Sequence, residues 1–332
     1  MKQVLITGAT GGLGRNAVEA LLSQGVAVRA TGRNSAVGNE LQQLGAQFVA
    51  CDLATMSSDQ AHALVAGCDT VWHCAALSSP WGAYSAFKAA NVQATATLAE
   101  AARQRNVQRF VHISTPALYF DFTHRYNVPE SFRPARFVNH YAATKAQAEH
   151  EVLARVARGL HATILRPRAI FGPYDQVLLP RLLRILDDKN GKLILPRGGN
   201  TLLDLTYAGN VVHAMQLAST TPNLSAGGVF NITNGVPVHV RDVLEALFER
   251  QLGRPMQVRT APYALLSTIA GAMELAANFT GREPSLTRYS LGALAFDMTL
   301  DISHAREVLG YLPQVSMAQA VVNTAQWFRS QP

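Results

Sequence analysis

A glycine-rich turn close to the N-terminus constrains the fold of this chain more than any other feature. Residues 2–7 form an apolar run that is too short for a helix and is followed by glycine, as expected for a buried parallel strand. From Leu13 to Leu22 apolar residues recur at helical spacing, so the turn joins a strand to a helix. Free backbone N–H groups at the start of that helix can receive a pyrophosphate, and glycine lets the phosphate approach.

The turn therefore predicts a dinucleotide-binding βα unit, because an ordinary βα turn rarely needs three glycines at this spacing. The cofactor-binding residues expected in the turn are Gly8, Thr10, Gly11, Gly12, Leu13 and Gly14.

The end of the second strand determines which nicotinamide cofactor the sequence favours. Residues 27–31 read as a strand, and dinucleotide folds usually place an acidic residue after it, against the adenosine ribose. Here that place falls near Gly32, and Arg33 follows. Since no carboxylate repels a 2′-phosphate and a guanidinium can pair with it, the sequence favours NADP(H) over NAD(H). Arg15 can assist, although a solvated position on the first helix is an equally good interpretation.

Two more strand ends extend the expected cofactor site. A carboxylate after the third strand, at 47–51, can meet the adenine amino group, and small residues after the fourth strand, which starts at Val71, leave room for the cofactor. His73 is interpreted as a packed strand histidine. The cofactor-binding residues expected at these two strand ends are Asp52, Leu53, Cys74, Ala75 and Ala76.

A tyrosine and a lysine four residues apart are suited to proton transfer. On a helix Tyr141 and Lys145 share one face, so the ammonium can lie below the phenol ring. A neighbouring cation lowers the phenol pKa from about 10, and Tyr141 can then exchange a proton with a carbonyl or alcohol oxygen while hydride passes to or from the nicotinamide. Thr115, at the tip of the fifth strand (109–115), would hydrogen-bond the same oxygen, with Ser114 as the weaker candidate. Lys145 would also hold the ribose hydroxyls.

Composition excludes several other classes of protein. The formal charge is +7, but the basic residues are scattered and no basic run is interleaved with aromatics, so we expect no nucleic-acid partner. The three cysteines, Cys51, Cys68 and Cys74, lack metal-binding spacing and favour reduced thiols in a cytoplasmic protein, with neither disulfides nor a metal. The N-terminus runs directly into the first strand, so we expect no signal peptide.

Short apolar runs alternate with helical stretches through about residue 170, which predicts an α/β fold with a doubly wound parallel sheet. We expect a dinucleotide-binding domain over residues 1–170 that regains about 204–235. A smaller substrate domain would then comprise residues 171–203 and 236–332.

Two segments outside the motifs bear on the substrate. Residues 120–137 read as a polar, irregular loop that can touch substrate, where Arg133 or Arg136 either pairs with a carboxylate or stays solvated. Residues 262–278 are almost uncharged, and we interpret them as a helix buried in the core of the smaller domain. A greasy lid and a peripheral membrane contact are the alternatives, while a transmembrane span needs a longer apolar run.

The motifs together resemble the extended short-chain dehydrogenase/reductase family, of the NAD-dependent epimerase/dehydratase superfamily. The resemblance implies a Rossmann-type domain with a smaller C-terminal α/β substrate domain, the catalytic set Thr115, Tyr141 and Lys145, and a homodimer formed through two long helices. It adds Asn91 and Pro167 to the expected cofactor-binding residues. The matching segments are 7–14, 52–53, 74–76, 91–95, 114–115, 141–145, 165–173, 204–207 and 310–311.

Within that family the sequence is most similar to the branch of 3β-hydroxysteroid dehydrogenases, sterol-4α-carboxylate 3-dehydrogenases and 2-alkyl-3-oxoalkanoate reductases. Members of the branch act on a secondary alcohol or ketone of an apolar molecule, often beta to a carboxylate, and some use NAD. In this chain Gly32 and Arg33 lie at the ribose-binding turn, which is a departure from the members of the branch that use NAD. The segments that carry this likeness are 81–84, 114–116, 140–146 and 286–289.

The leading hypothesis is an NADP(H)-dependent oxidoreductase that interconverts a ketone and a secondary alcohol on a small hydrophobic substrate, with 3-oxo carboxylates and sterol-like molecules as candidates. One alternative is a sugar-nucleotide epimerase or dehydratase, which uses the same catalytic residues with a tightly held cofactor. A second alternative is a cofactor-binding protein without catalysis.

Overall fold

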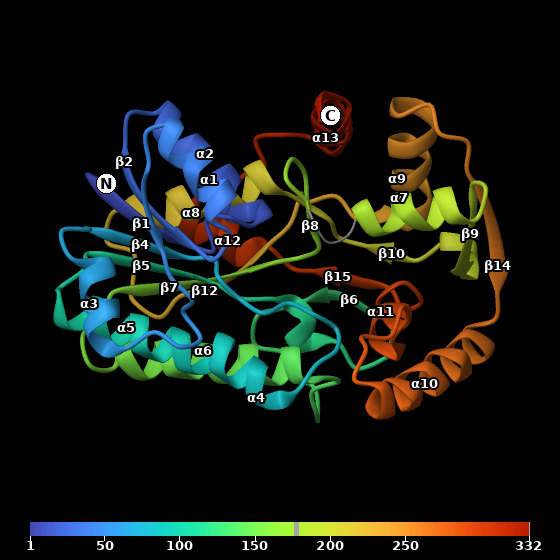
Figure 1. Cartoon of the computed structure of the whole chain (residues 1–332), viewed down its shortest axis with the longest axis horizontal. Helices are drawn as coiled ribbons and strands as arrows, with labels where there is room; N and C mark the ends of the chain where they lie inside the picture. The colour runs from blue at the N-terminus through green and yellow to red at the C-terminus, as the bar shows by residue number, and fades with distance from the viewer. Residues whose placement is uncertain (176–178, 332) are drawn as a thin grey trace.

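A seven-stranded parallel sheet is the centre of the computed structural model, which describes residues 1–175 and 179–331 (Figure 1). Its strands are β1 (Gln3–Thr7), β2 (Ala27–Gly32), β3 (Gln47–Ala50), β4 (Thr70–His73), β5 (Arg109–Ile113), β7 (Ala162–Pro167) and β12 (Val229–Ile232). The strand order β12-β7-β5-β4-β1-β2-β3 reverses direction between β1 and β4, and ligands of open α/β sheets bind at such a switch point. The predicted doubly wound α/β sheet is confirmed.

Helices cover both faces of this sheet (Figure 1). Ile6 of β1 packs into one core with Leu21 of the first helix, whereas the preceding residue, Leu5, packs into the opposite core with Leu98. Both faces of the strand are buried, which is why β1 is a continuous apolar run. One face carries α1 (Gly12–Ser23), α2 (Ser35–Gln43), α8 (Ala208–Thr220) and α12 (Ser303–Leu309), and the other carries α3 (Ser58–Val65), α5 (Ala94–Gln104) and α6 (His140–Val156).

A second group of elements lies beside the sheet, at the right of Figure 1. It contains a four-stranded sheet in the order β13-β10-β15-β6, made of β13 (Val238–His239), β10 (Leu202–Leu203), β15 (Met298–Leu300) and β6 (Arg125–Val128). Two strand pairs complete it: β14 (Gln257–Ala261) with β9 (Lys192–Pro196), and β11 (Thr206–Tyr207) with β8 (Ile170–Phe171). The remaining helices are α7 (Leu179–Asp188), α9 (Val240–Leu244), α10 (Tyr263–Thr280), α11 (Arg288–Ala293) and α13 (Met317–Ser330).

Several short helical segments connect these elements. They are α4 (Tyr84–Phe87), the π-helical η1 (Lys88–Gln93) and η4 (Glu245–Gln251), and the 3₁₀-helical η2 (Pro116–Tyr119) and η3 (Arg197–Gly199).

The segment 120–137 is more ordered than its composition indicates. It contains β6, which pairs in parallel with β15, and both Phe120 and Val128 are buried in an apolar cluster with Met298. The prediction of an irregular loop over the whole segment was therefore wrong. The strand forms because its partner comes from a distant part of the chain, and local periodicity does not report such a partner.

Helix α10 corrects the prediction for residues 262–278. Among its residues only two alanines, Ala270 and Ala277, are buried, whereas Leu275 is 60% and Phe279 84% exposed. The interpretation as a helix buried in a core is wrong, because large apolar side chains of the helix, Leu265, Ile269, Leu275 and Phe279, are exposed. Among the helices of the described residues, none combines the length and the hydropathy that a bilayer span requires.

Segments from both halves of the chain cross between the two groups of elements. Strand β6, within residues 1–170, belongs to the smaller sheet, while Ile302 and Tyr311, within 236–332, are buried in a core of the larger sheet. The division into a dinucleotide domain and a substrate domain at the stated boundaries stays a prediction.

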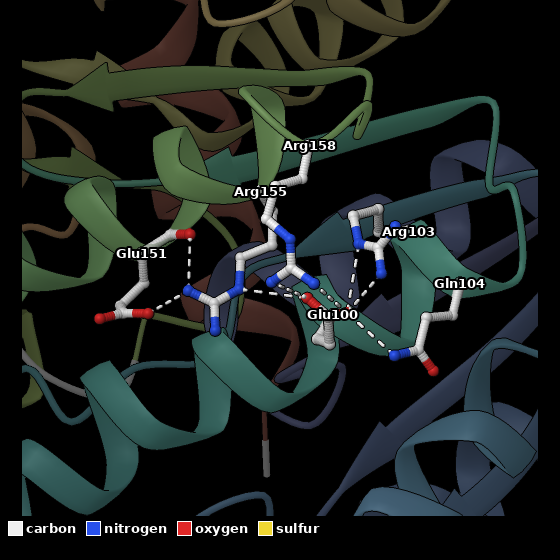
Figure 2. Close-up of polar contacts among 6 residues, drawn as sticks. All are labelled: Glu100, Arg103, Gln104, Glu151, Arg155 and Arg158. Atoms are coloured by element: carbon white, nitrogen blue, oxygen red, sulfur yellow. Dashed lines mark hydrogen bonds and ion pairs between the residues drawn. The ribbon is translucent and has the colours of Figure 1, made fainter.

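An ion network connects α5 and α6 on the outer face of the larger sheet (Figure 2). Glu100 accepts hydrogen bonds from Arg103 on its own helix. It also forms ion pairs with Arg155, in the last turn of α6, at 3.6 Å and with Arg158, just after α6, at 3.2 Å. The hydrogen bond from Arg103 is the largest cause that lowers the pKa of Glu100 to about 2. The network adds a polar contact to the apolar packing of the two helices.

Candidate active site

The glycine turn between β1 and α1 excludes side chains and leaves the start of the helix uncapped. Gly8 has φ +64°, and a Cβ there would lie 2.9 Å from the backbone of Ala75. A Cβ on Gly14 would lie 2.2 Å from the carbonyl oxygen of Gly8. No side chain caps α1 at Gly11, so its first N–H groups are available to an anion. The turn fits the pyrophosphate of a dinucleotide.

The ends of β2 and β3 present two exposed charged residues beside this turn. A Cβ on Gly32 would lie 2.5 Å from Oγ1 of Thr10, so the glycine turn packs directly against the end of β2. Arg33 is exposed and forms no hydrogen bond or ion pair within residues 1–175 and 179–331. Asp52 is also exposed, and its carboxylate accepts a hydrogen bond from the N–H of Ala54 at 3.1 Å.

The structure gives Arg15 a different role from the phosphate contact considered for it. Its guanidinium pairs with Glu40 at 2.7 Å and with Glu19 at 3.3 Å. It also stacks over the ring of Tyr174, 4.1 Å from the centroid. These contacts tie α1 to α2 and to the segment after β8.

Residues after β4 form the edge where the nicotinamide end is expected. The N–H of Ala75 donates to Oγ1 of Thr7 at 3.2 Å, which fixes this segment to β1. Asn91 accepts from the N–H of Leu77 at 2.7 Å and donates to the carbonyl of Leu77 and to Oγ1 of Thr144, both at 3.1 Å. Its amide is therefore fully engaged, and Asn91 shapes the edge instead of offering a free group.

The other expected cofactor residues lie at the carboxyl ends of the same sheet or in the glycine turn. Leu53 and Pro167 are buried, Cys74 is half-buried, and Ala76 is exposed. Burial raises the pKa of the Cys74 thiol to about 12, so this thiol is not a nucleophile at neutral pH. Gly12 is packed so that a Cβ would lie 2.9 Å from the carbonyl oxygen of Tyr174.

The structure brings Tyr141 and Thr115 together. Tyr141 is in the first turn of α6, which begins after Asn139, whose Oδ1 accepts from the N–H of Ala142 at 2.8 Å. Thr115 follows β5, and its Oγ1 accepts from the N–H of Ala117 at 3.1 Å. The phenol of Tyr141 hydrogen-bonds the side chain of Thr115. A phenol and a hydroxyl thus converge at one edge of the sheet and can contact the same substrate oxygen.

Lys145, one helical turn after Tyr141 on α6, reaches the neighbouring strand β5. Its side chain is 1% exposed, and Nζ donates to the carbonyl oxygen of Ile113 at 2.7 Å. Nε2 of His112 lies 3.2 Å from the same nitrogen. Burial lowers the pKa of Lys145 to about 8, opposed by the charge of Glu149.

The electrostatic expectation for Tyr141 was wrong in direction for the free protein. Burial is the largest cause and raises its pKa to about 12, and the hydrogen bond with Thr115 only partly opposes this. The ammonium of Lys145 is directed to Ile113 and His112. Although Tyr141 and Lys145 are four residues apart on one helix, the ammonium of Lys145 is therefore not directed at the phenol.

A pair of buried histidines supports this lysine. His73 and His112 occupy the same register on β4 and β5, with ring centroids 5.3 Å apart. His73 hydrogen-bonds Thr7 at 2.8 Å and Thr95 at 2.9 Å, which confirms it as a packed strand histidine. Burial and the charge of Lys145 lower the pKa of both histidines, so they are neutral. The sequence signal for this pair was one histidine on each of two successive strands.

Two further residues near Tyr141 were missed as site residues. Tyr289, on α11, is an electrostatic neighbour of Tyr141 and of Arg168, which directly follows β7. The ring of Tyr289 packs against Phe120, with centroids 5.8 Å apart. Both residues lie within segments that carried the family resemblance, and that was the available signal. Within the described residues, no group of three or more His, Cys, Asp or Glu side chains can hold a metal ion.

Comparisons with known proteins agree on one family. A model of the NAD dependent epimerase/dehydratase family matches residues 4–233. The chain is 45% identical to Uncharacterized protein YbjS of Escherichia coli (strain K12), over 98% of each chain.

Two relatives bear names that describe a reaction. A 4-hydroxy-2-methyl-3-oxo-4-farnesyl-3,4-dihydroquinoline-1-oxide ketoreductase of Stigmatella aurantiaca is 35% identical, over 96% of this chain and 94% of that protein. A 2-alkyl-3-oxoalkanoate reductase of Stenotrophomonas maltophilia (strain K279a) is 33% identical, over 96% and 97%.

A solved structure shows the same fold. UDP-glucuronic acid 4-epimerase from Bacillus cereus, in complex with NAD, superposes with a TM-score of 0.76 at 22% identity, over 98% of this chain and 96% of that chain.

Proposed function

The chain belongs to the NAD-dependent epimerase/dehydratase family, and on this premise we propose that it is an NADP(H)-dependent oxidoreductase that interconverts a ketone and a secondary alcohol on a hydrophobic substrate. The observation that carries the proposal is the contact of Tyr141 with Thr115, together with the buried ammonium of Lys145 one helical turn later on α6. The names of the ketoreductase and the 3-oxoalkanoate reductase support this reaction type.

The chain's own residues would divide the work of reduction as follows. The bound nicotinamide supplies the hydride. Tyr141, whose pKa of about 12 keeps the phenol protonated at neutral pH, donates its proton to the carbonyl oxygen. Thr115 donates a hydrogen bond to the same oxygen and orients it. Because a protonated phenol is ready to donate, this state of the site favours ketone reduction.

Other residues would hold the cofactor. The uncapped N–H groups of α1 would bind the pyrophosphate, and the glycine turn would let it approach the backbone. Lys145 would contact the nicotinamide ribose, and Arg33 would pair with a 2′-phosphate. The exposed position of Arg33 and its lack of a partner in the described part of the chain support NADP(H) over NAD(H).

Consumption of NADPH tests the proposal. Purified protein is given NADPH with an aliphatic 3-oxo acid, a 3-oxosteroid or a UDP-sugar, and absorbance of the reduced nicotinamide is followed. We expect turnover with at least one of the two ketones, and Tyr141→Phe should lower kcat by about 10²- to 10⁴-fold. Tyr84→Phe is the matched control, because Tyr84 is 40% exposed and, among the described residues, its hydroxyl hydrogen-bonds only Gln147.

Two outcomes would contradict the proposed reaction. Conversion of the UDP-sugar by protein that retains its nicotinamide, without any added, would assign a sugar-nucleotide epimerase. Binding of NADPH without turnover of any ketone, together with a biological effect that survives Tyr141→Phe, would assign a non-catalytic cofactor-binding protein.

The quaternary structure and location are part of the proposal. The family resemblance supports a homodimer formed through two long helices, for which α5 and α6 are the candidates because they lie together on one face. Light scattering of the purified protein should give twice the chain mass, and a monomer would contradict this. A cytoplasmic location stays a prediction; all three cysteines are free thiols.

A further inference from the structure

A buried arginine beside the candidate active site lacks an anion to pair with. Arg168 is 9% exposed and directly follows β7. Its Nε is buried without a hydrogen-bond partner, and within the described residues its guanidinium forms no ion pair. Burying a cation is costly unless an anion compensates for the lost hydration. A side chain of this kind indicates an anionic ligand.

Arg166, on the same strand, shows what a structural arginine looks like here. It is fully buried, and its guanidinium donates to both carboxylate oxygens of Glu149, to the hydroxyl of Tyr119 and to the carbonyl of Glu130. Burial lowers the pKa of Arg166, but the contacts with Glu149 and Tyr119 together raise it by more, so its pKa is higher than that of a free arginine. The pKa of Arg168 is shifted downward by burial, which its neighbours oppose only in part.

Two groups near Arg168 carry or can carry negative charge, and neither forms an ion pair with it. Asp204 attracts the guanidinium but is itself buried, and its carboxylate accepts the N–H of Leu300 at 2.7 Å and a hydrogen bond from Thr233. Tyr289 is a phenol whose pKa burial raises, so it is neutral. The donors of Arg168 therefore stay available.

The position of Arg168 places it near the reacting oxygen. Strands β5 and β7 are parallel neighbours in which Ile113 is paired with Leu165. Thr115 and Arg168 follow these paired residues by two and three positions, so both lie at the carboxyl edge of the sheet. Tyr289 is an electrostatic neighbour of both Arg168 and Tyr141, which places all three around one site.

We propose that Arg168 binds the carboxylate of the substrate and thereby selects a 3-oxo acid over a neutral ketone. This inference rests on the proposed reduction at Tyr141. In a 3-oxo acid a single methylene separates the carboxylate from the ketone carbon, so a group that binds the carboxylate has to lie beside the residues that contact the ketone oxygen. A guanidinium binds a carboxylate through two parallel hydrogen bonds, which would also fix the orientation of the ketone.

The structure favours Arg168 over the two arginines considered from the sequence. Arg133 and Arg136 are exposed. Arg133 already donates to the carbonyl oxygens of Glu130 and Phe132, at 2.6 and 2.7 Å. An exposed arginine gains little from pairing in water, whereas a desolvated one gains much more.

The test compares 3-oxodecanoate with its methyl ester, which has the same ketone and no charge. The wild type should prefer the acid, and Arg168→Gln should lower kcat/KM for the acid about 10- to 100-fold while changing the ester less than about twofold. Arg168→Lys should recover part of the loss. Arg133→Gln is the matched control and should leave both substrates unchanged. The KM for NADPH should be the same in all variants.

Several kinetic results would overturn the proposal. An equal loss of activity toward acid and ester in Arg168→Gln would indicate a structural role, and a raised KM for NADPH in that variant would assign Arg168 to the cofactor. A wild type that does not prefer the acid would also contradict it. The free Arg168→Met protein should melt at the wild-type temperature or above it, because an uncompensated buried charge has been removed. A clearly lower melting temperature would also count against the proposal.

Binding separates this inference from the proposed reaction. If neither ketone is reduced, the thermal shift caused by decanoate in the presence of NADP⁺ still reports on Arg168. Decanoate should raise the melting temperature of the wild type and not that of Arg168→Gln, and decanol should affect both equally. Equal shifts with decanoate would overturn the assignment of Arg168 whatever the fate of the reaction.

Discussion

At the residue scale, burial decides the charge of the groups that would do the chemistry. Lys145 is buried and Tyr141 is half-buried, and burial disfavours the charged form of each. The phenol therefore stays protonated, and the ammonium holds its proton less firmly than a lysine in water. The carbonyl of Ile113 and the neutral ring of His112 accept hydrogen bonds from Lys145 without adding a second charge.

The titration of Lys145 predicts the pH dependence of ketone reduction. Its pKa of about 8 means that the cation is lost as pH rises through that value, while Tyr141, at about 12, keeps its proton. We expect kcat/KM to be level near neutral pH and to fall above about pH 8. The profile is measured with saturating NADPH. In Lys145→Arg the charge persists, so the fall should move to higher pH; a wild-type profile that stays flat to about pH 10 would contradict the role of Lys145.

Arg33 predicts the cofactor preference. If its guanidinium pairs with the 2′-phosphate, Arg33→Ala should raise the KM for NADPH about 10- to 100-fold and leave the KM for NADH unchanged. Steady-state kinetics with the two cofactors measures this. Arg29→Ala, on the strand before Arg33, is a poor control because its guanidinium donates to backbone carbonyls. The exposed Arg136→Ala serves instead. Equal KM values for the two cofactors in the wild type would refute the argument.

At the scale of elements, α6 connects the stability of the fold to the candidate site. Its N-terminus, capped by Asn139, carries Tyr141, and its last turn carries Arg155, which pairs with Glu100 of α5. Its middle is anchored by Glu149, which pairs with the buried Arg166 of β7. The helix is thus capped at its N-terminus and held at two points to other elements, β7 and α5, which fixes the position of the phenol.

The Glu100 network predicts a small, acid-sensitive contribution to stability. The folded-state pKa of Glu100 is lowered to about 2 from 4.5, so its contribution is complete above the unfolded value and is lost as pH falls through the folded one. Glu100→Gln should lower the free energy of unfolding near neutral pH by at most about 1 kcal/mol, since the network is partly solvated. The difference from the wild type should shrink between about pH 4.5 and 2.

Urea denaturation at several pH values checks this prediction. Glu307→Gln is the control, because Glu307 is exposed on α12 and forms no ion pair in the described part of the chain. A pH-independent difference between wild type and Glu100→Gln would show that the carboxylate charge is not the cause.

At the scale of the whole molecule, the two groups of elements are interleaved along the chain. Strand β6 leaves the N-terminal half to join the smaller sheet, and the segment from Ile302 to Tyr311 returns to the core of the larger one. The candidate site lies where they meet, with Tyr141 from the larger unit and Tyr289 from α11. Loss of either sheet would therefore expose apolar surface in the other.

This interleaving predicts a single unfolding transition. Differential scanning calorimetry should show one endotherm, and NADPH at about 100 times its Kd should shift the whole endotherm upward, by an amount that corresponds to about 2.7 kcal/mol. NADH at the same concentration should shift it less. Two endotherms of which NADPH moves only one would show that the sheets unfold independently.

The sequence by itself determined the features that depend on neighbouring residues. The glycine turn, the strands around it and the placement of Tyr141 four residues before Lys145 are local patterns, and they predicted the doubly wound sheet, the family and a nicotinamide cofactor. The family resemblance also pointed to Thr115, which the structure places against Tyr141.

Only the tertiary structure decided which distant groups meet and which are left in water. Long-range packing gives Lys145 its partners, exposes the apolar face of α10 and pairs β6 with β15. It also buries Nε of Arg168 without a hydrogen-bond partner among the described residues. The physical reason is that hydration and electrostatic interaction depend on distance in space, whereas periodicity and turn chemistry depend on distance along the chain.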